Sequence, residues 1–161
     1  MTRSEYNDCV DQHADALYRF ILKNIKDEDD ARDIVQDAFE KMWKNIEMIE
    51  GTKSKSYLFT TAYHTMIDFI RKRKRISDYT EVTEESLFHT EQYSDLKQVL
   101  NNALNLLPDS QKAVITLRDY EGYSYEEIAE ITGLSLSQVK VYIYRARVFL
   151  KQYVGSMERV L

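Results

Sequence analysis

Residues 124–151 read SYEEIAEITGLSLSQVKVYIYRARVFLK and contain two helix starts separated by one helix stop. Ser124 is followed three residues later by a glutamate, and in such a pair each side chain can satisfy a free backbone N–H at the start of a helix. Gly133 lies where that helix must end, because glycine takes the left-handed conformation at no steric cost. Ser135 begins the next helix with the same pairing, here with a glutamine. The spacing predicts a helix-turn-helix unit.

The second of these helices has one apolar side, and its other sides are basic. The apolar side comprises Val139, Ile143, Ala146, Leu150 and Tyr153, spaced by three or four residues. Residues 135–153 contain no acidic side chain, in a chain whose formal net charge is −5. Recognition helices read base edges near their start and place cations near phosphates, so we expect a DNA-binding face here. It comprises Ser137, Lys140, Val141, Tyr144, Arg145 and Arg147. A pair of capped helices with a merely solvated basic side is the alternative.

The composition excludes several classes of protein. The chain has 161 residues, of which 43% are hydrophobic, enough for one domain or two small ones. No apolar run approaches the ~20 residues that span a bilayer, and no signal peptide is evident, so we expect a cytoplasmic protein without membrane insertion of its own. Cys9 is the only cysteine, which excludes an internal disulfide, and we expect it to face the core. No catalytic or metal-binding motif is present, so we expect no enzyme activity, cofactor or metal.

Charge is segregated along the chain. Residues 51–75 carry seven basic side chains against a single acidic one, namely Lys53, Lys55, Arg71, Lys72, Arg73, Lys74 and Arg75. They flank a helix expected to begin near Tyr57, and this helix is apolar nearly all round. Exposed aromatic rings beside cations suit single-stranded nucleic acid, because bases stack on the rings while the cations contact the phosphates. A solvated helix end is the alternative explanation for the five consecutive cations.

The remaining stretches predict helices and one connection. Apolar periodicity predicts amphipathic helices over residues 5–25 and 31–49, and Gly51 is expected to end the second. The outer face of the second helix includes Asp33, Gln36, Asp37 and Glu40, and it is either solvated or a docking surface for a basic partner. Residues 76–93 lack a helical stripe and predict a flexible acidic linker, which spans roughly 60 Å when fully extended. Residues 94–107 and 109–122 predict two further helices, the latter with Ala113, Val114, Leu117 and Tyr120 inside.

The sequence therefore predicts an all-α protein made of two small helical bundles joined by a flexible linker. The first bundle covers residues 1–75, the linker residues 76–93, and the second bundle, with the helix-turn-helix, residues 94–161. With four glycines and one proline, the chain offers few turns to a sheet. We expect the two bundles to be able to lie well apart on one DNA duplex.

Two bundles in this order resemble a bacterial sigma factor of the extracytoplasmic-function (ECF) group. Three stretches carry the resemblance: DARDIVQDAFEKMWKNI at 30–46, SYLFTTAYHTMIDFIRKRKR at 56–75 and LPDSQKAVITLRDYEGYSYEEIAEITGLSLSQVKVYIYRARVFLK at 107–151. The first stretch resembles the family's helix that docks on the β′ clamp helices of RNA polymerase. The second resembles the helix that melts and reads the −10 element. The third resembles the module that reads the −35 element.

The resemblance implies a role for each matching residue. Asp33, Gln36, Asp37 and Phe39 would contact core polymerase. Lys53, Lys55, Tyr57, Tyr63, His64 and the cations 71–75 would contact the −10 element, and the face described above would enter the −35 major groove. Members often carry Trp at 57 and an Arg-Asn pair at 63 and 64, where this chain has Tyr57, Tyr63 and His64.

The resemblance also implies partners. These are core RNA polymerase, through its β′ clamp helices and its β flap, promoter DNA, and an anti-sigma factor, with the chain a monomer when free. Nothing before the first helix looks like an autoinhibitory region, so we expect inhibition to come from outside. A free-standing helix-turn-helix regulator that acts without polymerase is the alternative, but it leaves residues 56–75 without a role.

Overall fold

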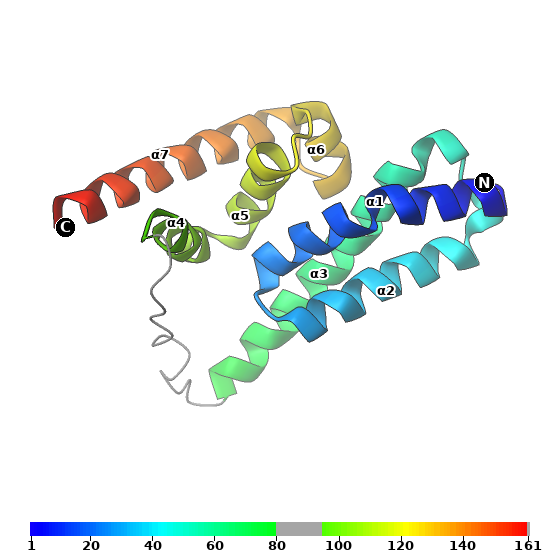
Figure 1. Ribbon diagram of the computed structural model, residues 1–161, viewed down its shortest axis with the longest axis horizontal. Helices are drawn as coiled ribbons and strands as arrows, with labels where there is room; N and C mark the ends of the chain where they lie inside the picture. Colours follow the sequence, from blue (N-terminus) through cyan, green and yellow to red (C-terminus); the bar gives the residue numbers. More distant parts are fainter. Residues whose placement is uncertain (80–94, 161) are drawn as a thin grey trace.

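The computed structural model describes residues 1–79 and 95–160, and the greater part of the predicted linker lies outside the described residues. The first bundle consists of α1 (Arg3–Ile25), α2 (Glu28–Lys44), the short 3-10 turns η1 (Ile46–Met48) and η2 (Gly51–Lys53), and α3 (Ser54–Tyr79). The second consists of α4 (Asp95–Leu106), α5 (Asp109–Ile115), the π-helical turn η4 (Thr116–Tyr120), α6 (Tyr125–Thr132) and α7 (Leu136–Val160). The described residues form no strand, and the predicted all-α fold of two helical bundles is confirmed (Figure 1).

The first bundle packs three long helices around one apolar core. Asp27 caps α2 by accepting a hydrogen bond from the backbone N–H of Asp30 at 3.0 Å, and Lys26 before it takes the left-handed conformation that ends α1. Phe20, Leu58 and other large side chains between the helices are fully buried. Cys9 faces this core at 3% exposure, as predicted.

The second predicted helix ends earlier than expected. Gly51 was predicted to end it, but α2 stops at Lys44 and Gly51 lies in η2. The cause is Asn45, whose side-chain amide donates to the backbone oxygen of Lys41 at 2.9 Å and to the hydroxyl of Tyr57 at 3.2 Å. The amide thus satisfies a carbonyl at the end of the helix and ties that end to α3. The apolar residues beyond Lys44 continue as turns along the bundle.

The helix-turn-helix in the second bundle is confirmed. Ser124 and Glu127 form a capping box, with both hydrogen bonds at 3.1 Å, and Gly133 ends α6 with φ +77°. Ser135 and Gln138 form the second capping box, with bonds of 3.0 and 3.1 Å. The apolar side of α7 is fully buried as far as residue 146 and half-buried beyond it.

One predicted helix changes its pitch. Residues 109–122 were expected to form a regular helix with Tyr120 on its inner side, but η4 interrupts it. A π turn places more residues in each turn than an α-helix does, so it rotates later side chains away from the apolar stripe. Leu117 remains fully buried, whereas Tyr120 is 43% exposed and its ring lies 4.2 Å from Nζ of Lys23.

Replacement of glycine with alanine is expected to change stability in opposite directions at two positions. Gly133 has positive φ and Gly155 lies inside α7, and a Cβ added at either position meets nothing within 4 Å. Gly133→Ala is expected to lower the free energy of unfolding by about 1 kcal/mol, because alanine is strained in the left-handed region. Gly155→Ala is expected to raise it by about 0.5–1 kcal/mol. Urea unfolding of both variants tests this, and equal shifts of one sign would contradict it.

The two bundles pack against each other, which the sequence did not predict. The start of α3 contacts α6, and α1 contacts α5 and η4. At the centre of the contact, the rings of Phe59 and Tyr123 lie 5.1 Å apart in an edge-to-face arrangement. Figure 1 shows α5 and α6 on the side of the first bundle formed by α1 and α3, with the two chain ends at opposite ends of the molecule.

Candidate nucleic-acid interface

The first turns of α7 present the predicted DNA-binding face. Its predicted members, Ser137, Lys140, Val141, Tyr144, Arg145 and Arg147, are all exposed, and Tyr144 is 70% exposed. The capping box at Ser135 fixes the start of the helix, so the direction of these side chains follows from helical periodicity. The ammonium of Lys140 lies 5.9 Å from the ring of Tyr125 on α6. The arrangement fits insertion of the helix start into a major groove.

Arg147 is held by a carboxylate of its own bundle. Its Nη2 lies 2.6 Å from one oxygen of Asp119 and its Nε lies 3.1 Å from the other. These bonds raise the pKa of the guanidinium above its usual value. A bidentate pair of this kind orients the side chain as well as its charge.

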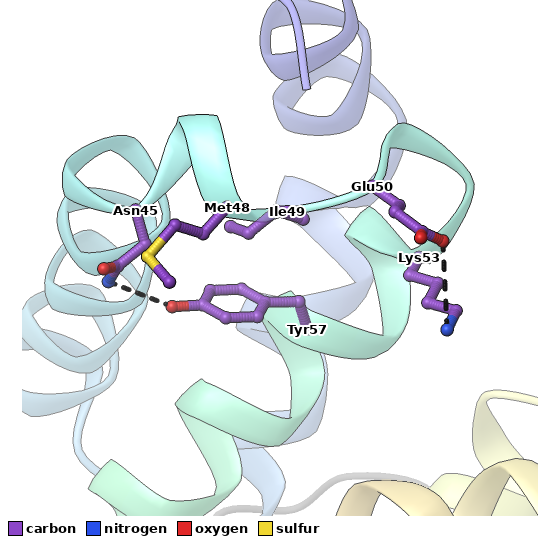
Figure 2. A pocket seen from close by; sticks show the side chains of 6 residues that line it. All are labelled: Asn45, Met48, Ile49, Glu50, Lys53 and Tyr57. Carbon is purple, nitrogen blue, oxygen red and sulfur yellow. Dashed lines mark hydrogen bonds and ion pairs between the residues drawn. The ribbon is translucent and has the colours of Figure 1, made fainter.

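The loop between α2 and α3 borders an open pocket of about 430 Å³. It is lined by Asn45, Met48, Ile49, Glu50, Lys53 and Tyr57. Figure 2 shows Asn45 and Met48 at one end, Glu50 and Lys53 at the other, and the ring of Tyr57 below the loop that joins them. Met48 is 86% exposed, so an apolar wall beside an aromatic ring is open to solvent. The pocket offers stacking and apolar contact together with one cation, a combination that suits a nucleobase.

Lys55 is half-buried and the cations at 71–75 of α3 are exposed, but several of these side chains already have partners. Lys55 pairs with Glu127 at 3.4 Å, Lys74 pairs with Asp109, and Nη1 of Arg73 donates to the backbone oxygen of Ile25 at 2.7 Å. Lys53 lies 3.8 Å from Glu50. Arg71, Lys72 and Arg75 are also exposed. Two of the predicted strand-binding cations are therefore held by carboxylates of the second bundle.

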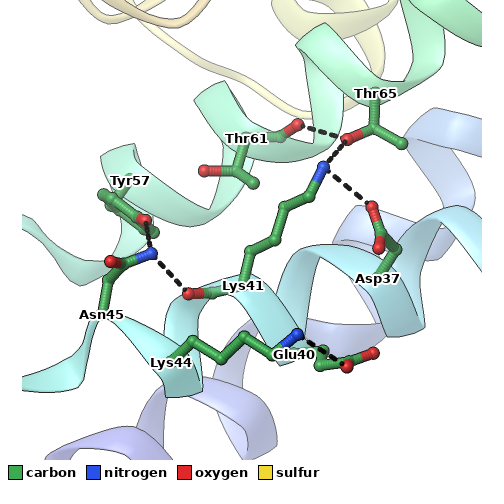
Figure 3. A network of polar contacts seen from close by, with 8 residues as sticks. All are labelled: Asp37, Glu40, Lys41, Lys44, Asn45, Tyr57, Thr61 and Thr65. Atoms are coloured by element: carbon green, nitrogen blue, oxygen red, sulfur yellow. Dashed lines mark hydrogen bonds and ion pairs between the residues drawn. The ribbon is translucent and has the colours of Figure 1, made fainter.

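The outer face of α2 is acidic and adjoins α3. Asp33 and Gln36 are exposed, and Asp37 pairs with Lys41 at 3.0 Å. Lys41 also donates to the hydroxyl of Thr65 on α3 at 3.2 Å, and Figure 3 shows this network bridging the two helices. A groove of about 410 Å³ runs beside it and is lined by Asp30, Asp33, Ile34, Asp37, Lys41, Thr65, Asp68, Phe69 and Lys72. Its carboxylates fit a basic partner.

Each bundle matches a known protein family. Residues 9–76 match the family described as Sigma-70 region 2, and residues 97–150 match Sigma-70, region 4. RNA polymerase sigma factor SigV of Bacillus subtilis is 36% identical, over 86% of this chain and 84% of its own. ECF RNA polymerase sigma factor SigM of the same organism is 31% identical, over 84% of this chain and 86% of its own. The chain belongs to the ECF sigma factors.

A solved structure extends the likeness to both bundles together. The sigma factor RpoE of Bartonella quintana, in complex with the anti-sigma factor NepR, is 30% identical and covers 93% of this chain and 96% of its own, with a TM-score of 0.76. The present sigma factor is an RNA polymerase specificity subunit by this membership, and the alternative of a free-standing regulator is not favoured.

Two residues predicted to contact the −10 strand differ in accessibility. His64 of the sigma factor is exposed, whereas Tyr63 is only 7% exposed. Burial raises the pKa of the Tyr63 hydroxyl, and the nearby carboxylate of Asp109 raises it further, while Arg71 lowers it. In this arrangement the ring of Tyr63 packs in the core, and its contact with a base stays a prediction.

Sequence reasoning missed several residues at these surfaces of the sigma factor. Asn45 and Met48 form one end of the pocket, but a polar and an apolar residue in a loop carry no signal of their own. Asn24 and Thr116 are buried at the contact between the bundles. Both interrupt apolar stretches, and a polar residue inside such a stretch is the signal that could have found them.

The described residues of the sigma factor offer neither a membrane-spanning helix nor a metal-binding cluster. None of its described helices has both the length and the apolar character that crossing a membrane requires. Within residues 1–79 and 95–160, no three His, Cys, Asp or Glu side chains lie close enough together to hold a metal ion.

Proposed function

We propose that this sigma factor directs promoter recognition through two surfaces that act on DNA in different states. The start of α7 reads the −35 element as duplex, and the pocket at Tyr57 with the cations of α3 takes the unpaired −10 strand. The proposed domain limits are residues 1–75 for the −10 and polymerase functions and residues 94–161 for the −35 function. The observation that carries the proposal is the presence, on one chain, of an exposed basic helix start and an aromatic pocket with a cation at its rim.

The −10 contact is a capture of one unpaired base. A base that leaves the stack loses a few kcal/mol of stacking and pairing energy, so it needs a pocket with an aromatic surface. The ring of Tyr57 and the side chain of Met48 supply that surface, and Lys53 lies at the rim for a phosphate. His64, Arg71, Lys72, Arg73 and Arg75 follow along α3 and would hold the backbone of the strand.

The core-polymerase contact is the outer face of α2. Asp33, Gln36 and Asp37 would face basic groups of the β′ clamp helices, with the second bundle on the β flap. Phe39, the fourth predicted member, is half-buried, and its ring packs edge-on against Tyr6 with centroids 6.5 Å apart. Phe39 therefore supports this face from the interior of the bundle.

An anti-sigma factor is the remaining proposed partner. The support is the likeness, over both bundles, to a sigma factor solved in complex with one. The free chain would be a monomer that passes from this inhibitor to the polymerase.

Transcription in vitro tests the proposed function. Core polymerase alone should give no specific transcript from a promoter selected by mapping starts in cells that overproduce the chain, and the mixture with this sigma factor should initiate there. A chain that never associates with core polymerase, yet protects duplex DNA by itself, would overturn the proposal in favour of a free-standing regulator.

Two substitutions on α7 should separate base reading from phosphate binding. Lys140→Ala is expected to weaken holoenzyme binding to the cognate −35 element by about 1–3 kcal/mol and to relax its sequence preference. Arg147→Ala should weaken binding to all sequences alike and reduce the salt slope by about one. Titrations on cognate and scrambled duplexes at several salt concentrations measure both. A uniform loss from Lys140→Ala would show that the two roles are reversed.

A further inference from the structure

One face of α3 carries a row of partly or fully exposed side chains, here called the strand track, which begins at the Tyr57 pocket. Its members recur every three or four residues and therefore share one side of the helix: Tyr57, Thr61, His64, Asp68, Arg71 and Arg75. Figure 3 shows the first two on successive turns of α3. At about 1.5 Å per residue, His64 lies about 10 Å along the axis from Tyr57 and as far again from Arg71. It occupies the middle of the track.

The permanent cations of α3 lie toward its two ends. Residues 56–70 contain no lysine or arginine, a stretch of about 20 Å along the helix. They contain one acidic side chain, Asp68, and one histidine. A strand that runs from the Tyr57 pocket to the cations 71–75 therefore passes several phosphates over a stretch without a permanent positive charge. His64 is the one side chain of this stretch that can gain such a charge.

His64 is exposed, and its contact in the described structure is with a neighbouring ring. That ring belongs to Tyr63, with the two centroids 5.5 Å apart at an interplanar angle of 64°. Along α3, Asp68 lies one turn further on and Arg71 about two turns, so one charge of each sign follows the imidazole on the track. The helix itself therefore does not commit His64 to one charge state.

Neighbouring elements also leave His64 without a charged partner. The carboxylates they bring to the flanks of α3 each hold a lysine: Asp37 of α2 holds Lys41, Asp109 of α5 holds Lys74, and Glu127 of α6 holds Lys55. Asp30 and Asp33 of α2 line a groove with Lys72, further along α3. Histidine is the side chain that ordinarily changes its charge between pH 5 and 8. The charge at the middle of the strand track therefore follows the pH of the solution.

We propose that His64 is a proton-dependent ligand of the unpaired −10 strand, whose imidazolium contacts a phosphate between the Tyr57 pocket and Arg71 and loses this contact with its proton. The inference rests on the proposed function, because it takes α3 as the path of the strand. Its sign follows from linkage: a phosphate favours the charged form, so affinity for the strand rises as the pH falls. Promoter opening by this sigma factor thus strengthens on mild acidification.

The other two histidines provide control positions. His13 of α1 is half-buried, with its ring edge-on to that of Phe59 at 6.5 Å between centroids. Burial lowers its pKa, and the nearby ammonium of Lys55 lowers it further, so this ring stays uncharged near neutral pH. His89 lies outside the described residues and outside the strand track.

Binding of a labelled −10 strand to the holoenzyme at about pH 6 and about pH 8 tests the proposal. Anisotropy of a tetramethylrhodamine label, whose emission does not depend on pH in this range, gives the affinity. The ratio of the two affinities should be about three- to fivefold larger for the native chain than for His64→Asn, because one phosphate contact contributes about fivefold in about 0.1 M salt. The salt dependence of the native chain should also be steeper at the lower pH, by up to about 0.7 in slope.

A permanent cation at the same position separates charge from the imidazole ring. His64→Lys should show the same small affinity ratio as His64→Asn, because neither side chain changes its charge between these pH values. It should nevertheless bind the strand about fivefold more tightly than His64→Asn at both. His13→Gln and His89→Gln should keep the ratio of the native chain. Circular dichroism at both pH values confirms that each variant is folded.

The outcomes separate this inference from the proposed function. Strand binding with equal affinity ratios for the native chain and His64→Asn would overturn the inference alone. A loss from His64→Asn that is equally large at both pH values would also overturn it, because the ring would then act without its charge. A holoenzyme that binds no −10 strand at either pH refutes the proposed function, and the inference with it.

Discussion

Replacing Phe59 with alanine is expected to lower the free energy of unfolding by about 3–5 kcal/mol, the range for deleting a fully buried aromatic ring. The ring has no exposed surface and lies 6.2 Å from the ring of Phe20 and 5.1 Å from that of Tyr123. Phe20 belongs to the first bundle and Tyr123 to the second, so one deletion opens a cavity in the core and weakens the contact between the bundles. Chemical unfolding followed by circular dichroism measures the loss.

Phe149 provides the control for this substitution. Its ring is half-buried on α7 and stacks on Tyr153 with centroids 6.0 Å apart, away from the first bundle. Phe149→Ala should cost much less, because its ring leaves water only in part. Equal losses at the two positions would mean that Phe59 is not at the centre of the core.

Replacing Tyr57 with alanine is expected to abolish most of the ability of the holoenzyme to hold an opened promoter. One stacked base contributes roughly 1–3 kcal/mol, so the open complex should weaken by about 5- to 150-fold. Binding to the −35 duplex should be retained, because α7 lies in the other bundle. Permanganate reactivity of unpaired thymines reports the opening, and a gel shift with a −35 duplex reports the retained contact.

Tyr57→Phe separates stacking from hydrogen bonding at the same position. Phenylalanine keeps the ring but loses the hydroxyl that accepts from Asn45 at 3.2 Å. This variant should open promoters nearly as well as the native chain. A loss as large as that of Tyr57→Ala would show that the hydroxyl, by fixing the loop at the end of α2, matters more than the ring.

The helix starts of the second bundle could be predicted from sequence because their causes are local. The side chains of Ser124 and Ser135 each accept a hydrogen bond from a residue three positions on. Gly133 takes the left-handed backbone conformation that ends α6. The end of α2 and the π turn at Thr116 depend on partners distant in sequence, Tyr57 in one case and Asn24 in the other. Apolar periodicity gives no information on such distant partners. The sequence therefore predicted a longer α2 and a buried Tyr120.

Some parts of the candidate site could likewise be predicted from the sequence, and others could not. The exposed row on α7 follows from helical periodicity alone, and the sequence placed all its members on the surface correctly. The pocket at Tyr57 requires the loop to fold back over α3, and no local sequence pattern predicts this. The burial of Tyr63 could not be predicted, because a helix that is apolar nearly all round gives no indication of which ring faces solvent.

The orientation of the ion pairs between the bundles gives ionic strength two opposite effects on the free sigma factor. The cation side chains of the pairs Arg19–Glu121, Lys55–Glu127 and Lys74–Asp109 remain 40–64% exposed, so dissolved counterions reach them and weaken the contact between the bundles as their concentration rises. The same counterions compete with the protein for phosphates. Affinity of the free chain for a strand should therefore pass through a maximum at intermediate ionic strength, which titrations of a labelled strand at several salt concentrations would show.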